Sequence, residues 1–372
     1  MKLIRTANKG GRLLEAYLIL EDGTVFRGRH IGAERDSISE IVFNTSMTGY
    51  LEILTDPSYC GQSVVMTYPL IGNYGVCYDD MEDENSYVEG YITGEMCGYP
   101  SNFRSQDPLE KFLIDRNIPG ITNVDTRALT KKLRSEGTMN GMITCRPDFN
   151  LEEILPKIKE YRIVNPVDTV TCSEITKIPG DGFKVALMDL GTKKDIPLCL
   201  ARRGCEVTIY PAHTPAEEII AAAPDGIVLS NGPGDPKDCV EIIQEIKKLY
   251  DSSIPIFAVC LGHQLMALAN GADTRKMKWG HRGANHPVKD LRTGRVYISS
   301  QNHGYVIKNK SVPEDVAEIC FVNANDGSVE GLHYLGKNVF TVQFHPEACP
   351  GPQDTAFLFD EFIHMMEVSK NA

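Results

Sequence analysis

Residues 254–265 read IPIFAVCLGHQL, and this stretch decides the fold. The apolar run IPIFAV predicts a buried strand, and a helix is expected to begin near Leu261. Cys260 would then lie at the corner between strand and helix, where a tight turn lifts its side chain above the end of a sheet. Gly262 lets such a turn close without a side chain in the way. The stretch therefore predicts an α/β unit with a cysteine held at its corner.

A cysteine at such a corner is well placed to act as a nucleophile. The helix N-terminus carries a partial positive charge, which favours the thiolate over the thiol. The amide of Leu261 would lie in the first helical turn, free to donate to a developing oxyanion. Taken alone, however, Cys260 could equally be a buried structural cysteine, the commonest fate of a free cysteine. Its companions in the sequence have to decide between the two interpretations.

The composition is that of a globular protein with two or three domains. The chain has 372 residues, of which 42% are hydrophobic and 24% charged. Its formal net charge is −12 and it has no long basic run, which argues against nucleic acid or an anionic membrane surface as a partner.

The cysteines and the N-terminus indicate a cytoplasmic protein. The chain has 11 cysteines, an odd count, and no C-x-x-C spacing, which favours a reducing compartment over a disulfide framework. Residues 1–12 read as a loose polar tail. Glu15 interrupts the apolar stretch that follows, so no signal peptide is predicted, and no apolar run has the length of a membrane span.

Residues 1–147 are expected to form a smaller, β-rich α/β domain. Between residues 39 and 75, short apolar runs alternate with Gly, Thr, Asn and Pro, which predicts short strands joined by functional loops. Helical spacing follows at residues 108–118 and 125–136. Asp125 is the expected N-cap of the second helix, and a glycine directly after it is the expected stop.

Residues 148–182 read as a linker with one short amphipathic helix, and residues 183–372 as the larger domain. From residue 183 apolar strand patterns alternate with helical patterns. This alternation predicts a doubly wound, mostly parallel sheet. Ligands of such sheets bind beyond the carboxyl ends of the strands. Cys260 follows one predicted strand, and the Gly-rich loop at residues 230–236 follows another.

His345 and Glu347 are the candidate partners of the cysteine. They follow the apolar run VFTVQF, and residues two apart in an extended chain point to the same side. Glu347 could orient the imidazole of His345, which would take the proton of Cys260 and return it to a leaving amine. A lone histidine at a strand end is more often a packed or surface residue. A His-x-Glu pair in the same α/β unit as a cysteine corner favours the catalytic interpretation.

The loop SNGPGDP, residues 230–236, is the candidate second oxyanion donor. The bare backbone at Gly232 and Gly234 could approach a substrate closely. A plain tight turn and a phosphate cradle are the alternatives. The loop lacks the Lys-Ser/Thr ending of a P-loop and the spacing of a dinucleotide fingerprint.

The other histidines are assigned no catalytic or metal-binding role. His263 lies three residues into the predicted helix and should point away from the Cys260 thiol. His281, His286 and His303 have neither an HxxxH spacing nor a cysteine partner at ligand spacing, so no metal site is predicted.

The motifs NGPGDP, CLGHQ and HPE occur in this order over residues 183–372, and together they resemble the class I, triad-type glutamine amidotransferases. The resemblance implies hydrolysis of the side-chain amide of glutamine and delivery of the ammonia to a synthase. It implies Cys260 as nucleophile, His345 as base and Glu347 as the carboxylate that orients the base.

Further segments resemble the small subunit of carbamoyl-phosphate synthase. They are FNTSMTGYLEILTDPSYCGQ from Phe43, GYITGE at 90–95, GITNVDTRALTKKLR at 120–134 and KMKWGHRGANHPVKD at 276–290. In that family the glutamine lies between the two domains. Carried over by position, its contacts would be Ser46, Gly232, Gly234, Leu261, Gln264, Asn302, Gly304 and Tyr305.

Some of these positions can be examined further. Gln264 lies one helical turn past Cys260, on the face that looks back toward the nucleophile, where its amide could bond the α-amino or α-carboxyl group of the substrate. Residues 302–305 are expected in a loop after the strand VYISSQ. Tyr305 stands where the family often has Phe, and Ala258 where it commonly has Gly.

The resemblance implies a separate large subunit that makes carbamoyl phosphate from bicarbonate and ATP, for arginine or pyrimidine synthesis. This chain shows no ATP-binding pattern. ATP and Mg would therefore belong to the partner, and the chain itself would need no metal or organic cofactor. The alternatives are a stand-alone γ-glutamyl hydrolase, the glutaminase subunit of another synthase, and a non-catalytic scaffold. A stand-alone hydrolase has no use for residues 43–75, and a scaffold has no need of the complete cysteine, histidine and glutamate set.

Overall fold

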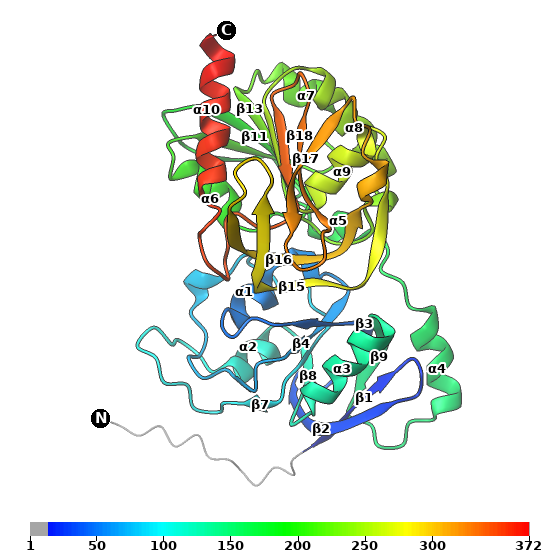
Figure 1. Cartoon of the computed structure of the whole chain (residues 1–372). Coiled ribbons are helices and arrows are strands. Elements are labelled where there is room, and N and C mark those ends of the chain that lie inside the picture. Colours follow the sequence, from blue (N-terminus) through cyan, green and yellow to red (C-terminus); the bar gives the residue numbers. More distant parts are fainter. Residues whose placement is uncertain (1–13, 372) are drawn as a thin grey trace.

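The computed structural model describes residues 14–371, so the tail expected at residues 1–12 lies outside it. Two domains are stacked, the N-terminal one in blue to cyan and the C-terminal one in green to red (Figure 1). The N-terminal domain is a closed barrel in the order β1-β2-β8-β6-β4-β3-β9. Its strands are β1 Glu15–Leu20, β2 Val25–Gly32, β3 Ser37–Asn44, β4 Gln62–Met66, β6 Gly90–Ile92, β8 Pro119–Thr122 and β9 Met139–Thr144. This barrel confirms the predicted β-rich α/β domain.

Short helices and loops cover the barrel. The helices are α1 Tyr50–Thr55, α2 Leu109–Asp115, α3 Thr126–Glu136 and the 3-10 turns η1 Pro57–Tyr59 and η2 Tyr78–Asp80, and β5 Leu70–Ile71 pairs with β7 Glu95–Met96. Asp125 caps α3 as predicted, because its carboxylate accepts from the amide of Ala128 at 2.9 Å. Gly137 ends this helix with φ of 111°, a conformation that favours glycine.

The span expected as a linker is shared between the two domains. Its first helix, α4 Leu151–Glu160, packs Ile158 against Tyr17 and Ile19 of the barrel. After α5 Pro166–Val170, the strand β10 Thr176–Ile178 pairs with β12 and forms one edge of the C-terminal sheet.

The C-terminal domain is built on a ten-stranded sheet in the order β10-β12-β11-β13-β14-β19-β18-β17-β15-β16. The five strands from β12 to β19 run parallel, which confirms the predicted α/β sheet, and antiparallel strands extend it at both edges. The strands are β11 Lys184–Asp189, β12 Glu206–Pro211, β13 Gly226–Leu229, β14 Ile256–Val259, β15 Thr274–Asp290, β16 Val296–Ile307, β17 Ala317–Asn323, β18 Val329–Tyr334 and β19 Val339–Val342.

Helices cover both faces of this sheet, as its double winding requires. One face packs on α7 Ala216–Ala221, α8 Val240–Asp251 and α9 Leu261–Ala269, and the other on α6 Asp195–Ala201 and α10 Phe357–Asn371. The 3-10 turns η3 Pro236–Asp238 and η4 Asn309–Ser311 complete the domain. No helix within residues 14–371 has both the length and the apolar character that crossing a membrane requires.

The long β15–β16 hairpin reaches down to the barrel (Figure 1). The amide of Thr45 donates to the carbonyl of Arg282 at 3.1 Å, and the amide of Thr138 to that of Lys278 at 2.8 Å. Residues 302–305 lie inside β16, so the prediction that they form a loop was wrong. They stay extended because they pair across the hairpin with β15, with Asn302 opposite Arg282.

Candidate active site

Cys260 lies at the corner between β14 and α9, as the sequence predicts. It has φ of 53°, a left-handed backbone that a non-glycine residue rarely adopts and that marks a strained strand-to-helix turn. Its amide donates to the carbonyl of Val342 at 2.8 Å, and the amide of Gly262 to that of Ser230 at 3.0 Å. A Cβ on Gly262 would come within 2.6 Å of the Leu229 carbonyl, so glycine is needed here for close approach to β13.

The Cys260 thiol is buried, with 2% of the residue exposed. Its Sγ lies 3.6 Å from the carbonyl oxygen of Asn302, to which it can donate, and 3.6 Å from the Gln343 amide nitrogen, which can donate to it. Leu261 begins α9, where helix geometry provides no partner for its amide. The thiol therefore lies between polar groups of neighbouring strands and the N-terminus of a helix.

His345 and Glu347 follow β19 and form a buried pair beside this thiol. The amide of His345 is held by the Ser300 carbonyl at 2.9 Å. Its Nδ1 lies 2.6 Å from Oε1 of Glu347. Nε2, the other ring nitrogen, is buried without a hydrogen bond of ordinary length to the described residues. Catalytic hydrogen bonds are often long before substrate binds.

The charges of this pair are strongly coupled. Burial opposes a charge on His345, but Glu347 and the neighbouring Cys260 thiol outweigh it and raise the pKa of His345 to about 10. Burial likewise opposes ionisation of Glu347, yet Lys193 and His345 lower the pKa of its carboxyl group to about 2. The structure therefore favours a protonated imidazole and an ionised carboxylate at neutral pH.

Lys193 is a charged member of the site that the sequence analysis missed. Its Nζ lies 3.0 Å from Oε1 of Glu347 and donates to the Ala348 carbonyl at 2.6 Å. The residue is 2% exposed. Burial alone would neutralise this amine, but Glu347, Glu82 and Asp56 keep its pKa above the ordinary value. Its position in the loop after the strand β11 was the available signal, since ligands bind at that edge.

Both glycines of the Gly-rich loop pack closely against other segments of the chain. A Cβ on Gly232 would lie 2.1 Å from the Leu190 carbonyl oxygen. Gly234 has φ of 95°, and a Cβ there would lie 2.5 Å from Pro166. Ser58 of the N-terminal domain accepts a hydrogen bond from the side chain of Asn231 at 2.8 Å. The barrel thus contacts the loop that was predicted to supply oxyanion donors.

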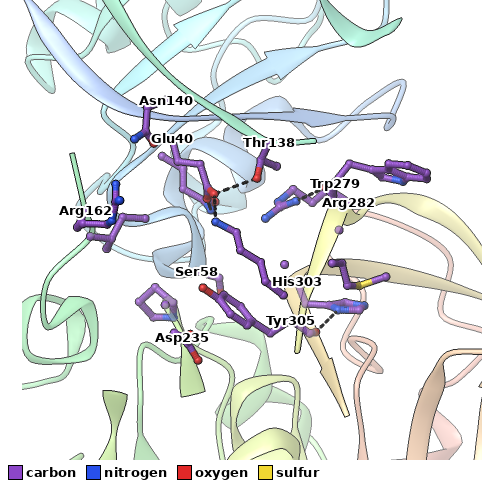
Figure 2. Close-up of a pocket in the computed structure, with 18 of the residues that line it drawn as sticks. Glu40, Ser58, Thr138, Asn140, Arg162, Asp235, Trp279, Arg282, His303 and Tyr305 are labelled. Carbon is purple, nitrogen blue, oxygen red and sulfur yellow. Dashed lines mark hydrogen bonds and ion pairs between the residues drawn. The ribbon is translucent and has the colours of Figure 1, made fainter. Parts of the chain in front are cut away.

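A cavity of about 860 Å³ lies between the domains, with Cys260 in its wall. Figure 2 shows its lining, with Glu40, Thr138 and Asn140 from the barrel facing His303 and Tyr305 from the C-terminal domain. The predicted site residues in its wall, besides the cysteine, are Gly232, Gly234, Gln264, Asn302, Gly304 and Tyr305. Their convergence makes this cavity the candidate substrate site.

Ser46 and Leu261 do not line this cavity. Leu261 is 1% exposed, so only its backbone remains as a contact. Ser46 lines a second, much smaller cavity of about 10 Å³ next to His345 and Lys193, and its expected contact with glutamine stays a prediction. The serine that does line the large cavity is Ser58, from the same quoted segment.

Gln264 is fixed in one orientation. Its amide nitrogen donates to the Tyr305 carbonyl at 2.8 Å and to Oε1 of Gln343 at 2.9 Å. Because both donors are used, only its oxygen is left to face a ligand in the cavity.

His263, His281 and His303 each have a hydrogen-bonding partner in the protein. His263 is fully buried with Nδ1 2.7 Å from the Thr341 hydroxyl, and burial lowers its pKa to about 3, which agrees with its exclusion as the base. His281, His303 and Glu330 bring potential ligand atoms within 4.8 Å of one another, a proximity that the sequence spacing did not reveal. Nε2 of His281 lies 3.0 Å from Asp326, and Nδ1 of His303 lies 2.8 Å from the Tyr305 carbonyl.

The fold and this site define a class I glutamine amidotransferase domain. The family model described as "Glutamine amidotransferase class-I" matches residues 186–365, and "Carbamoyl-phosphate synthase small chain, CPSase domain" matches residues 18–143. The chain belongs to the family of carbamoyl phosphate synthase small chains. It is 50% identical to the small chain from Listeria innocua over 95% of this chain and 97% of that protein. It is 49% identical to the one from Clostridium perfringens, over 94% and 99% respectively.

Proposed function

We propose that this chain is the glutaminase subunit of a carbamoyl phosphate synthase. The observation that carries the proposal is the buried Cys260, His345 and Glu347 set, whose cysteine lines a cavity that could hold an amino acid. It occurs in a chain that matches carbamoyl phosphate synthase small chains along nearly its whole length. The partner would be a separate large subunit, which receives ammonia and uses bicarbonate, ATP and Mg.

The first half of the reaction forms a thioester. The thiolate of Cys260 attacks the γ-amide carbon of L-glutamine, and the oxygen becomes an oxyanion held by the Leu261 amide and a Gly-rich-loop amide. His345, protonated at neutral pH, gives its proton to the departing nitrogen, and ammonia leaves. The side-chain oxygen of Gln264 accepts from the α-ammonium group of the substrate.

The second half regenerates the thiol. His345, now neutral, takes a proton from water, which attacks the γ-glutamyl thioester and releases glutamate. The sum is glutamine plus water giving glutamate plus ammonia, so the chain needs no metal or organic cofactor of its own for this step. All eleven cysteines are free thiols, which supports a reducing cytoplasm as the location.

Replacement of Cys260 tests the proposal. In Cys260→Ser, hydrolysis of glutamine and glutamine-dependent synthesis by the complex with the large subunit should both fall to background. Synthesis from added ammonium should continue, because it bypasses this site. Retained glutaminase activity in Cys260→Ser would refute the proposal. If ammonium-dependent synthesis were lost as well, the variant would have damaged the complex rather than the site.

A further inference from the structure

Glu82 is a buried carboxyl group of the N-terminal domain that lies against the turn carrying Lys193. Its backbone amide donates to the hydroxyl of Thr55, at the end of α1, at 2.9 Å. From the other domain, the amide of Lys194 donates to the Glu82 carbonyl at 2.8 Å and the amide of Asp195 to its Oε2 at 3.3 Å. The residue is 3% exposed. Glu82 thus joins the two domains next to the lysine that holds Glu347.

Residues 193–195, which Glu82 contacts, also contact a strained segment that directly follows His345 and Glu347. Ala348 and Cys349 have φ of 63° and 39°, left-handed values that cost energy in non-glycine residues. Nζ of Lys193 bonds the Ala348 carbonyl and the Glu347 carboxylate together. Whatever fixes the position of Lys193 therefore also fixes this segment and, through Glu347, the ring of His345.

The groups around Glu82 determine its charge. A carboxylate oxygen of Asp195 and the Sγ of Cys349 lie within 4.8 Å of its carboxyl group. The charges of Lys193 and Glu347 also act on this group. Burial raises the pKa of Glu82 to about 8, and the charges of Asp195 and Glu347 act in the same direction, while the charge of Lys193 opposes them. At neutral pH the side chain therefore acts mainly as an uncharged hydrogen-bonding group.

We infer that Glu82 is a positioning residue through which the N-terminal domain keeps the turn at residues 193–195, and with it Lys193, Glu347 and His345, aligned on Cys260. The inference rests on the proposed glutaminase function. It gives the N-terminal domain an effect on the catalytic base that is transmitted through Lys193 and Glu347, separate from the residues that this domain contributes to the wall of the substrate cavity. Substrate contacts such as Gln264 and the Gly-rich loop lie on other elements, so the effect should fall on kcat rather than on KM.

Substitutions of Glu82 in the full-length chain test this role, with exposed Glu84 in the same loop as the matched control. We expect Glu82→Ala to lower kcat for glutamine hydrolysis roughly tenfold at pH 7, since a small misplacement of catalytic groups costs up to about 100-fold. Its KM should stay near the wild-type value. Glu82→Gln should restore kcat at pH 7, because its side-chain oxygen can accept from the Asp195 amide, and Glu84→Ala should behave as wild type.

Two further measurements separate positioning from damage to the fold. In a Lys193→Met background, Glu82→Ala should cause little additional loss, because residues acting through one another are non-additive. Between pH 7 and 9 wild-type Glu82 ionises beside Asp195, Cys349, Lys193 and Glu347, whereas glutamine does not. The ratio of wild-type to Glu82→Gln activity should therefore change over this range.

The rate at which iodoacetamide alkylates Cys260, followed by mass spectrometry of its peptide, decides the inference independently of glutamine turnover. Glu82→Ala should slow this alkylation at pH 7, and Glu82→Gln should not.

Unchanged kcat and alkylation in Glu82→Ala, a rise in KM alone, or full additivity with Lys193→Met would overturn the inference. If Glu82→Ala fails to fold, the inference is overturned when the ratio of wild-type to Glu82→Gln activity stays constant between pH 7 and 9. Failure of the proposed function is a different result, since wild type would then hydrolyse glutamine no faster than Cys260→Ser.

Discussion

Cys260 and His345 approach the reacting centre from two parts of the molecule that are held in different ways. Cys260 is fixed within the C-terminal domain, by the backbone bonds of its own turn to β19 and by the packing of α9 on β13. His345 depends on the buried charges of Glu347 and Lys193, and the turn that carries Lys193 is hydrogen-bonded to Glu82 of the N-terminal domain. The barrel also packs Gly49 so closely on Pro350 that a Cβ there would lie 2.1 Å away.

The difference indicates that the proposed nucleophile is preformed by local geometry, whereas the proposed base is aligned by contacts between domains. A strand-to-helix corner needs few partners, because its backbone shape alone exposes the cysteine. A charged imidazole in a buried site needs a carboxylate, and the carboxylate needs its own partners. Substitutions of the residues that align His345, which are Glu347 and Lys193, should therefore alter the pH dependence of the reaction. Substitutions in the barrel that do not touch these residues should not.

Among the residues that align His345, substitution of Glu347 by Gln should have the largest effect on the rate of glutamine hydrolysis. We expect kcat to fall about 10³- to 10⁴-fold, the loss seen when the carboxylate of a triad is replaced by its amide. Without Glu347, burial dominates and the pKa of His345 falls from about 10. Since His345 must be protonated to release ammonia, the alkaline limb of the rate should move to lower pH. Rates of glutamine hydrolysis between pH 6 and 10 measure this shift. An unchanged limb would contradict the assignment.

Lys193→Met should have a smaller effect on rate and the opposite effect on pH dependence. Removing a cation from beside Glu347 raises the pKa of His345 further, so the alkaline limb should move to higher pH. We expect kcat to fall about 10- to 100-fold through misplacement of the pair. Breaking a buried ion pair should also lower the free energy of unfolding by about 3 kcal/mol.

The neighbouring Lys194 is exposed and provides the control for this variant. Lys194→Met should leave the rate, the pH profile and the unfolding midpoint in urea close to wild type. If Lys193→Met moved the alkaline limb in the same direction as Glu347→Gln, the charge coupling described for this site would be wrong.

The same contrast explains what the sequence could predict. The corner at Cys260 and the strand end before His345 are local patterns, so the positions of these two residues and the parallel part of the sheet followed from them. Lys193 acquires its role only when the loop after β11 meets the strand end after β19, 154 residues away. Ser58 enters the wall of the large cavity only because the N-terminal domain packs on the C-terminal one, which no local pattern shows. Residues 302–305 were mistaken for a loop because their pairing partner in β15 lies far back in the chain.

Substitution of the N-cap of α3, in the N-terminal domain, should have the smallest effect, and it tests whether the general stability of this domain affects His345. Asp125 caps α3, is exposed, and does not line the large cavity. Asp125→Ala should lower the free energy of unfolding by about 1 kcal/mol, measured by urea denaturation, because one amide of the first helical turn loses its acceptor. Asp125→Ser, which can still cap, should recover most of this loss. Both should keep wild-type kcat, KM and pH profile, because the barrel acts on His345 through particular contacts rather than through its general stability. A shifted alkaline limb in Asp125→Ala would show instead that any loosening of the barrel reaches the catalytic pair.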